Sequence, residues 1–114
     1  EALDRGMVRI KGNYETSVKR GSLAQDEYER RFARIHPVAA IEELGDCDVV
    51  IEAVFEQIDV KKDVWQRLDK VMPQGALLYS NTSGIDIDIM ANATKRPQDV
   101  AGTHFFAPAN VMKR

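Results

Sequence analysis

The stretch Asp48-Val49-Val50-Ile51-Glu52-Ala53-Val54-Phe55-Glu56 decides the fold class of this chain. It is a short, almost unbroken apolar run that follows a polar turn and precedes a helical pattern. Such a run predicts a buried strand of a parallel sheet. Ligands of open α/β sheets collect beyond the carboxyl ends of such strands, where Glu52 and Glu56 lie. From the strand alone, a core strand with solvated glutamates at its exit is the favoured interpretation.

Composition limits the class of protein. The 114 residues make one domain at most, and 30% charged with 44% hydrophobic residues are typical of a globular chain. A net charge of -2 gives no sign of nucleic-acid binding, and no apolar run is long enough to span a bilayer. The single cysteine, Cys47, cannot form an intrachain disulfide. We therefore expect a cytoplasmic protein, or one of an organelle matrix in a eukaryote. Because the chain starts at Glu1 without a Met, we also expect a piece of a longer protein.

The residues after the central strand alternate between helical and strand patterns. Apolar residues at 60, 64, 68 and 71, with Trp65 beside them and Asp59 as N-cap, predict a helix. Strands are expected at 76–80 and 100–106, with a short helix around 85–93 between them. Alternating strands and helices imply right-handed crossovers and a parallel sheet, so the fold class is α/β.

The first 35 residues predict a helical hairpin. Leu3, Met7, Ile10, Tyr14 and Val18 form one helical face, and Gly21 suits a left-handed stop. Ser22 and Gln25 predict a capping box for a second helix, whose buried face would be Ala24, Tyr28, Phe32 and Ile35. A short strand is expected at 38–40. The first helix also carries Arg5, Arg9, Lys11, Lys19 and Arg20, for which a solvated face is a better interpretation than phosphate contacts.

Polar residues gather at the predicted strand ends: Glu56, the Asn81-Thr82-Ser83 turn, and His104. In a parallel sheet these ends share one edge. No metal spacing is present, since His36 and His104 are isolated. A lone His in an apolar strand is more often a core residue than a catalyst, and no Gly-x-Ser-x-Gly elbow surrounds Ser83. The pattern alone therefore predicts half of a nucleotide-type α/β domain.

Three motifs together resemble the L-3-hydroxyacyl-CoA dehydrogenase family, in its order and at its spacing. They are the stretch at 48–56, Asn81-Thr82-Ser83, and His104-Phe105-Phe106-Ala107-Pro108-Ala109-Asn110-Val111-Met112-Lys113. The resemblance implies a partial Rossmann-type parallel sheet, made of the distal strands and helices at 36–114 and preceded by the hairpin at 1–35. It also implies NAD-dependent oxidation of a 3-hydroxyacyl-CoA to the 3-ketoacyl-CoA in fatty-acid β-oxidation.

The resemblance also implies residue roles. His104 would be the general base, a task that suits imidazole, which titrates near neutral pH. Ser83 would hydrogen-bond the substrate oxygen, while Glu56 and Lys61 would contact the ribose and nicotinamide region of NAD. Asn81, in the same turn, is also assigned to cofactor binding. The hairpin would help to hold CoA, which makes Lys19 and Arg20 candidates for its phosphates.

Several departures from the family limit these expectations. The Gly-x-Gly-x-x-Gly phosphate turn and the acidic residue that holds the adenine ribose are absent, and the Glu that orients the catalytic His would follow Arg114. Arg114 also replaces the usual apolar residue, and Ala107 favours a parent fused to an enoyl-CoA hydratase.

The alternatives are a β-hydroxyacid dehydrogenase with a non-CoA substrate and a non-catalytic structural or binding module. We expect the isolated piece to bind NAD poorly and to self-associate through the edge at 49–54 or through its hairpin.

Overall fold

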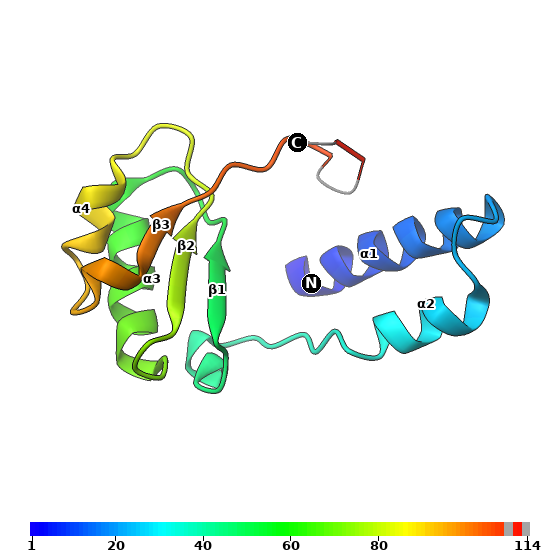
Figure 1. The fold of residues 1–114 in the computed structure, drawn as a ribbon, viewed down its shortest axis with the longest axis horizontal. Helices are drawn as coiled ribbons and strands as arrows, with labels where there is room; N and C mark the ends of the chain where they lie inside the picture. Colours follow the sequence, from blue (N-terminus) through cyan, green and yellow to red (C-terminus); the bar gives the residue numbers. More distant parts are fainter. Residues whose placement is uncertain (109–110, 113–114) are drawn as a thin grey trace. The chain divides into compact units, whose positions relative to one another are not determined.

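A computed structural model describes residues 1–108 and 111–112 (Figure 1). Contacts between Cα atoms divide the chain into two compact units, Glu1–Ala39 and Ala40–Arg114. Four positions of the C-terminal motif region, Ala109, Asn110, Lys113 and Arg114, lie outside the described residues. Within the described part of the chain, no helix is long and apolar enough to cross a membrane.

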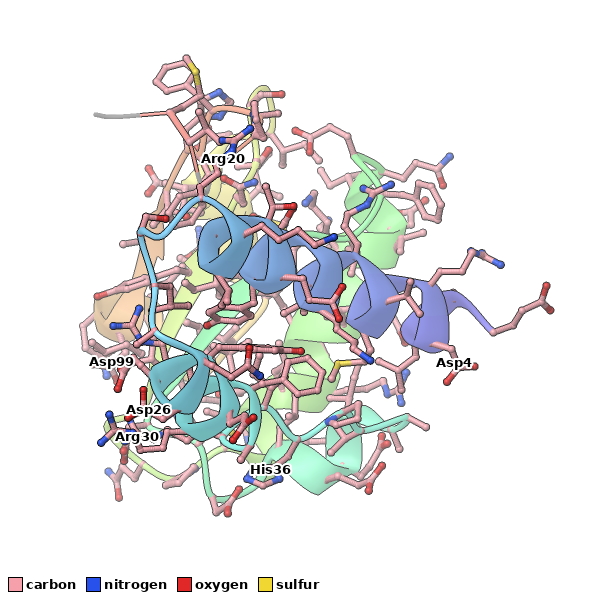
Figure 2. All side chains as sticks on the ribbon, turned by 90° about the vertical axis from the view of Figure 1, so that its right-hand side faces the viewer. Asp4, Arg20, Asp26, Arg30, His36 and Asp99 are labelled. Atoms are coloured by element: carbon pink, nitrogen blue, oxygen red, sulfur yellow. The ribbon has the colours of Figure 1, made fainter. Side chains whose placement is uncertain are left out.

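The first unit is the predicted helical hairpin, formed by α1 (Ala2–Lys19) and α2 (Gln25–Phe32). After α1, Gly21 adopts a φ of 71°, the left-handed stop that the sequence predicts. Tyr14 and Tyr28 stack with ring centroids 5.4 Å apart, and Tyr28 is the buried residue of α2. Figure 2 shows the charged side chains around both helices, with Asp4 and Arg20 near opposite ends of α1.

Two predictions for this region are wrong. The residue before α2 is Ala24, without a side-chain cap, and the Ser22 hydroxyl instead donates to the Ser17 carbonyl at 3.0 Å. The predicted capping box therefore does not form, because the end of α1 uses the serine. The strand expected at 38–40 is also absent. There the Ala40 N–H donates to the Glu43 carboxylate at 2.9 Å and opens the 3-10 helix η1 (Ile41–Leu44).

The second unit contains a parallel sheet of β1 (Val49–Glu52), β2 (Leu77–Ser80) and β3 (Val100–Gly102) in the order β1-β2-β3. This confirms the predicted α/β fold and its parallel sheet. The third strand is shorter than the expected 100–106. Thr103 N–H donates to the Ser80 carbonyl at 2.8 Å, and β2 ends at Ser80, so the ladder offers no further strand partner.

The helices that follow the strands supply the core. They are α3 (Ile58–Val71) and α4 (Ile87–Ala91), and a 3-10 helix η2 (Pro97–Asp99) leads into β3. The buried cluster comes from α3, β2, α4 and the segment that joins α3 to β2: Trp65, Leu68, Met72, Ala76, Leu78 and Met90. Next to Met72 of this cluster, the side chains of Asp69 and Arg96, both 11% exposed, form an ion pair at 2.8 Å.

The buried face of α3 contains three of the four predicted stripe residues, since Leu68 lies in the core and Val64 and Val71 pack against it. Trp65 lies in the core with an exposed fraction of 0%, whereas Val60, expected in the apolar stripe, is 37% exposed. Lys61 is buried on the same face as Trp65. The helix also begins two residues earlier than expected, with Gln57 rather than Asp59 at its N-cap. The apolar pattern missed the position of Lys61, because a lysine is not expected at a buried position.

Candidate active site

The three strands end at the same level. Glu52 of β1 is aligned with Ser80 of β2, and Ser80 with Gly102 of β3. The segments that leave these strands therefore start from one edge of the sheet (Figure 1). This edge is where the sequence predicts a ligand site.

Glu56 joins the exit of β1 to the turn after β2. Its Oε1 atom accepts hydrogen bonds from the Thr82 hydroxyl, from Ser83 N–H at 3.2 Å and from Gly84 N–H at 3.1 Å. The Thr82 hydroxyl, the two backbone N–H groups and the Lys61 ammonium lower the pKa of Glu56 to about 2. The side chain is 42% exposed, so an ionised carboxylate is available at the edge of the sheet.

The turn after β2 presents Ser83. The Thr82 hydroxyl accepts from Ile85 N–H at 3.0 Å, which closes the turn before α4, and Ser83 itself is exposed. Turns built by a hydroxyl in this way are a common use of Thr. The turn is thereby held from two sides, by Thr82 within it and by Glu56 from the neighbouring strand exit.

Asn81 joins the same turn to the segment that carries His104. Its Oδ1 atom accepts from Phe105 N–H at 2.8 Å. His104 is exposed, and its ring packs edge-on against Phe106 with centroids 5.3 Å apart. Hydrogen bonds thus connect all three strand exits, although among the described residues no hydrogen bond or ion pair joins the His104 ring to Ser83 or Glu56.

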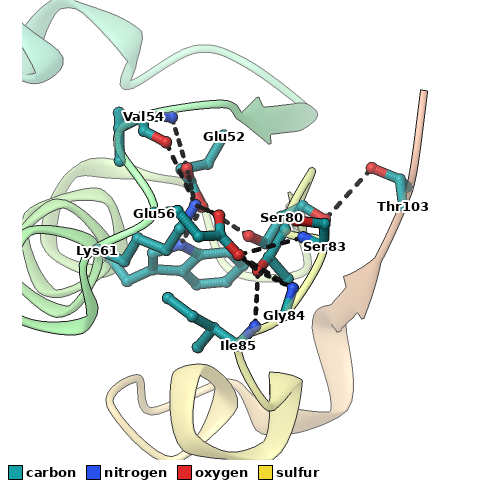
Figure 3. A network of polar contacts seen from close by, with 11 residues as sticks. Glu52, Val54, Glu56, Lys61, Ser80, Ser83, Gly84, Ile85 and Thr103 are labelled. Atoms are coloured by element: carbon teal, nitrogen blue, oxygen red, sulfur yellow. Dashed lines mark hydrogen bonds and ion pairs between the residues drawn. The ribbon is translucent and has the colours of Figure 1, made fainter. Parts of the chain in front are cut away.

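Lys61, expected to contact the cofactor, lies beneath Glu56 with its side chain 0% exposed. Its ammonium donates to Glu52 Oε1 at 2.7 Å and to the Val54 carbonyl at 3.5 Å, and it lies 3.5 Å from Glu56 Oε2 (Figure 3). The positive charge is therefore shared between two carboxylates. A direct contact with a cofactor stays a prediction for this residue.

Glu52 is the residue whose position the sequence analysis missed. Its side chain is 1% exposed, although a solvated glutamate was expected. The carboxylate accepts from Lys61, from Val54 N–H at 2.6 Å, from the Ser80 hydroxyl at 2.6 Å and from Trp65 Nε1 at 3.3 Å. Burial opposes ionisation, but these hydrogen bonds, led by those from Lys61 and Ser80, hold the pKa of Glu52 below its usual range.

A sequence signal for Glu52 did exist. The residue interrupts an apolar strand, and an acid there needs a buried partner. The partner is a lysine on the first turns of the following helix.

In the part of the chain that the structure describes, no group of His, Cys, Asp and Glu side chains is arranged to hold a metal ion.

The chain is similar in sequence to a known protein family and to several known proteins. The family described as "3-hydroxyacyl-CoA dehydrogenase, NAD binding domain" matches residues 1–114. The chain is 43% identical to 3-hydroxyadipyl-CoA dehydrogenase of Escherichia coli (strain K12), over 99% of the chain and 24% of that protein. It is 41% identical to the peroxisomal bifunctional enzyme of Danio rerio, over 97% of the chain and 15% of that protein. The chain therefore spans at most about a quarter of these relatives' length.

Solved structures agree with the sequence matches. The crystal structure of 3-hydroxybutyryl-CoA dehydrogenase from Escherichia coli K12 matches with a TM-score of 0.95 and 43% identity, covering 99% of this chain and 24% of that one. That of (S)-3-hydroxybutyryl-CoA dehydrogenase from Ralstonia eutropha matches with a TM-score of 0.93 and 30% identity, covering 97% and 39%. The predicted Rossmann-type arrangement is thereby confirmed.

Proposed function

Because the chain belongs to the family of 3-hydroxyacyl-CoA dehydrogenase NAD-binding domains, we propose that the full-length protein oxidises an L-3-hydroxyacyl-CoA to the 3-ketoacyl-CoA with NAD, as a step of fatty-acid β-oxidation. The observation that carries this proposal is the hydrogen-bonded joining of three strand exits, by Glu56 to the turn at 82–84 and by Asn81 to Phe105. The segments that leave the strands carry the three groups that the reaction needs. Glu56 is a hydrogen-bond acceptor for the cofactor, Ser83 has a hydroxyl for the substrate oxygen, and His104 is a base.

In this proposal His104 acts as general base. It takes the proton of the substrate hydroxyl while the hydride leaves C3, so that the C3–O bond becomes a carbonyl. Ser83 hydrogen-bonds the same oxygen. Both residues are exposed on segments that leave neighbouring strands, which supports their access to one substrate.

NAD would supply the hydride acceptor. The residues present suit its nicotinamide side, because Glu56 offers an ionised carboxylate whose Oε2 has acceptor capacity for a ribose hydroxyl. Asn81 and Lys61 belong to this side as well, Asn81 in the turn and Lys61 behind Glu56. For CoA, the exposed Lys19 and Arg20 at the end of α1 are the proposed phosphate contacts.

The test is turnover of acetoacetyl-CoA with NADH by the full-length protein, followed as loss of NADH absorbance. We expect turnover with acetoacetyl-CoA and none with free acetoacetate. Turnover of the free acid alone would favour a β-hydroxyacid dehydrogenase with a non-CoA substrate. Absence of turnover and of NAD binding would favour a non-catalytic module.

Two further proposals concern the chain's surroundings. Relatives include peroxisomal proteins, and we propose that the protein works in the cytoplasm, or in an organelle matrix if its source is a eukaryote.

We also propose that the 114-residue chain by itself self-associates. In the described residues β1 pairs only with β2, and Val49 and Ile51 on it are 46% and 50% exposed.

A further inference from the structure

His104 lies on a segment that continues past the end of the sheet. The strand β2 ends at Ser80 and β3 ends at Gly102, so the histidine follows the last paired residues. Its ring packs against Phe106, but both rings are exposed and belong to the same segment, so this contact does not tie the segment to the sheet. A general base must lie within hydrogen-bond reach of the proton that it takes. Support for this segment therefore has to come from neighbouring elements.

Hydrogen bonds on both sides of His104 supply that support. The Thr103 N–H, just before the histidine, donates to the Ser80 carbonyl at 2.8 Å, and the Thr103 hydroxyl donates to the same carbonyl at 3.4 Å (Figure 3). The Phe105 N–H, just after the histidine, donates to Asn81 Oδ1 at 2.8 Å. The backbone of His104 is therefore held between two adjacent residues at the end of β2.

The Asn81 side chain takes the place of a strand carbonyl. In a parallel ladder the hydrogen bonds are evenly spaced, so alternate N–H groups of one strand donate to alternate carbonyls of its neighbour. After the bond from Thr103, the next one would join the Phe105 N–H to the Thr82 carbonyl. At Thr82 the chain has turned away, because its hydroxyl and the two N–H groups that follow bind Glu56. The Asn81 oxygen thus extends the ladder by one hydrogen bond after the backbone of β2 has left it.

The backbone of Asn81 is itself held by the neighbouring strand. The Asn81 N–H donates to the Glu52 carbonyl at 2.8 Å. The hydroxyl of Ser80, one residue earlier, donates to the Glu52 carboxylate at 2.6 Å, and both of these side chains are buried. The Asn81 side chain therefore starts from a fixed point and can pass that position on to the segment that carries His104.

We propose that Asn81 is a positioning residue for the general base: its side-chain oxygen holds the Phe105 N–H and so sets where the His104 imidazole meets the substrate hydroxyl. The inference rests on the proposed function, in which His104 takes the substrate proton. It uses only the oxygen of the Asn81 amide, and it is separate from the cofactor contact proposed for the same residue.

The test is a double-variant cycle in the full-length protein, with the acetoacetyl-CoA assay. Asn81→Ala removes the acceptor, and we expect kcat to fall about ten- to a hundredfold, since a misplacement of about 1 Å can cost about a hundredfold in rate. In a His104→Gln background the same substitution should change kcat by less than about threefold, because the base that Asn81 positions is already lost. Equal losses in both backgrounds would overturn the proposal, because Asn81 would then act without His104.

Two further variants make the result specific. Asn81→Asp keeps an oxygen that can accept from the Phe105 N–H, so its kcat at the plateau of the pH profile should exceed that of Asn81→Ala. A kcat as low as that of Asn81→Ala would count against the proposal. Thr94→Val is the matched control, because the Thr94 hydroxyl also accepts from a backbone N–H, that of Arg96 at 3.2 Å, in the segment between α4 and η2. This variant should lower the melting temperature and leave kcat unchanged.

Hydrogen exchange of the backbone amides tests the contact apart from activity. The Phe105 amide should be protected in the wild type and should exchange at least about tenfold faster in Asn81→Ala, while the Tyr79 amide within β2 keeps its protection. If Asn81→Ala does not fold, Asn81→Ser replaces it, because its shorter side chain does not reach Phe105. An unprotected Phe105 amide in the wild type would overturn the positioning even where turnover is present. Absence of NAD-dependent turnover in a wild type with a protected Phe105 amide would instead overturn the proposed function, and the role of Asn81 with it.

Discussion

Glu56 joins the exit of β1 to the turn after β2, and its ionisation has a consequence for stability. Its pKa lies at about 2 in the folded chain, below the ordinary value of 4.5, chiefly because the Thr82 hydroxyl donates to it. A depressed pKa stabilises the folded state at pH values above the unfolded pKa. That stabilisation is lost as the pH falls from about 4.5 through about 2.

Glu56→Gln tests this dependence. The difference in free energy of unfolding between wild type and Glu56→Gln should be largest above pH 4.5 and should disappear near pH 2. Urea denaturation of both proteins at a series of pH values measures it, and the other carboxyl groups cancel because both proteins have them. A difference that does not change with pH would contradict the assigned contacts.

Some of these residues could be predicted and others could not. Glu56, the turn at 81–83 and His104 each follow a strand, and the ends of parallel strands share one edge. Which atoms they bond depends on the turn geometry, which sequence spacing does not determine. Glu52 was expected in solvent because a glutamate in a strand usually is, and only its tertiary partners Lys61, Trp65 and Ser80 make its burial favourable.

Among the elements, α3 has most of its predicted apolar stripe in or against the core, through Val64, Leu68 and Val71. Its ends were close to expectation, but Trp65 rather than Val60 lies in the core. Leu68→Ala should destabilise the chain by about 2–5 kcal/mol, because Leu68 is 2% exposed and its loss leaves a cavity. Val60→Ala should cost less than about 1 kcal/mol, since its site is 37% exposed. Chemical denaturation of both variants gives the comparison, and equal costs would contradict the exposed position of Val60.

At the scale of the whole molecule, the sheet has β1 as an edge strand, and we expect this edge to pair with another chain. Within the residues described, β1 pairs on one side only, and an exposed apolar edge favours pairing with another chain. We expect light scattering to show oligomers of the 114-residue chain at high micromolar concentration and Ile51→Lys to reduce them. A stable wild-type monomer would contradict the prediction, as would rapid hydrogen exchange throughout 49–54.

Cofactor binding also depends on more than the residues present in this chain. The sequence contains no Gly-x-Gly-x-x-Gly turn, on which the pyrophosphate of a dinucleotide normally rests. Calorimetry of the 114-residue chain should therefore detect weak NAD binding or none. Micromolar affinity would reveal a phosphate site elsewhere in these residues.

The kcat of His104→Gln in the full-length protein tests the central claim most directly. If His104 is the general base of a 3-hydroxyacyl-CoA dehydrogenase, the substitution should lower kcat by about 10²–10⁴, the usual contribution of a positioned acid–base group. The affinity for NAD should change little, because the base touches the substrate. A variant that keeps near-normal kcat would show that the proton leaves by another route and would contradict the account.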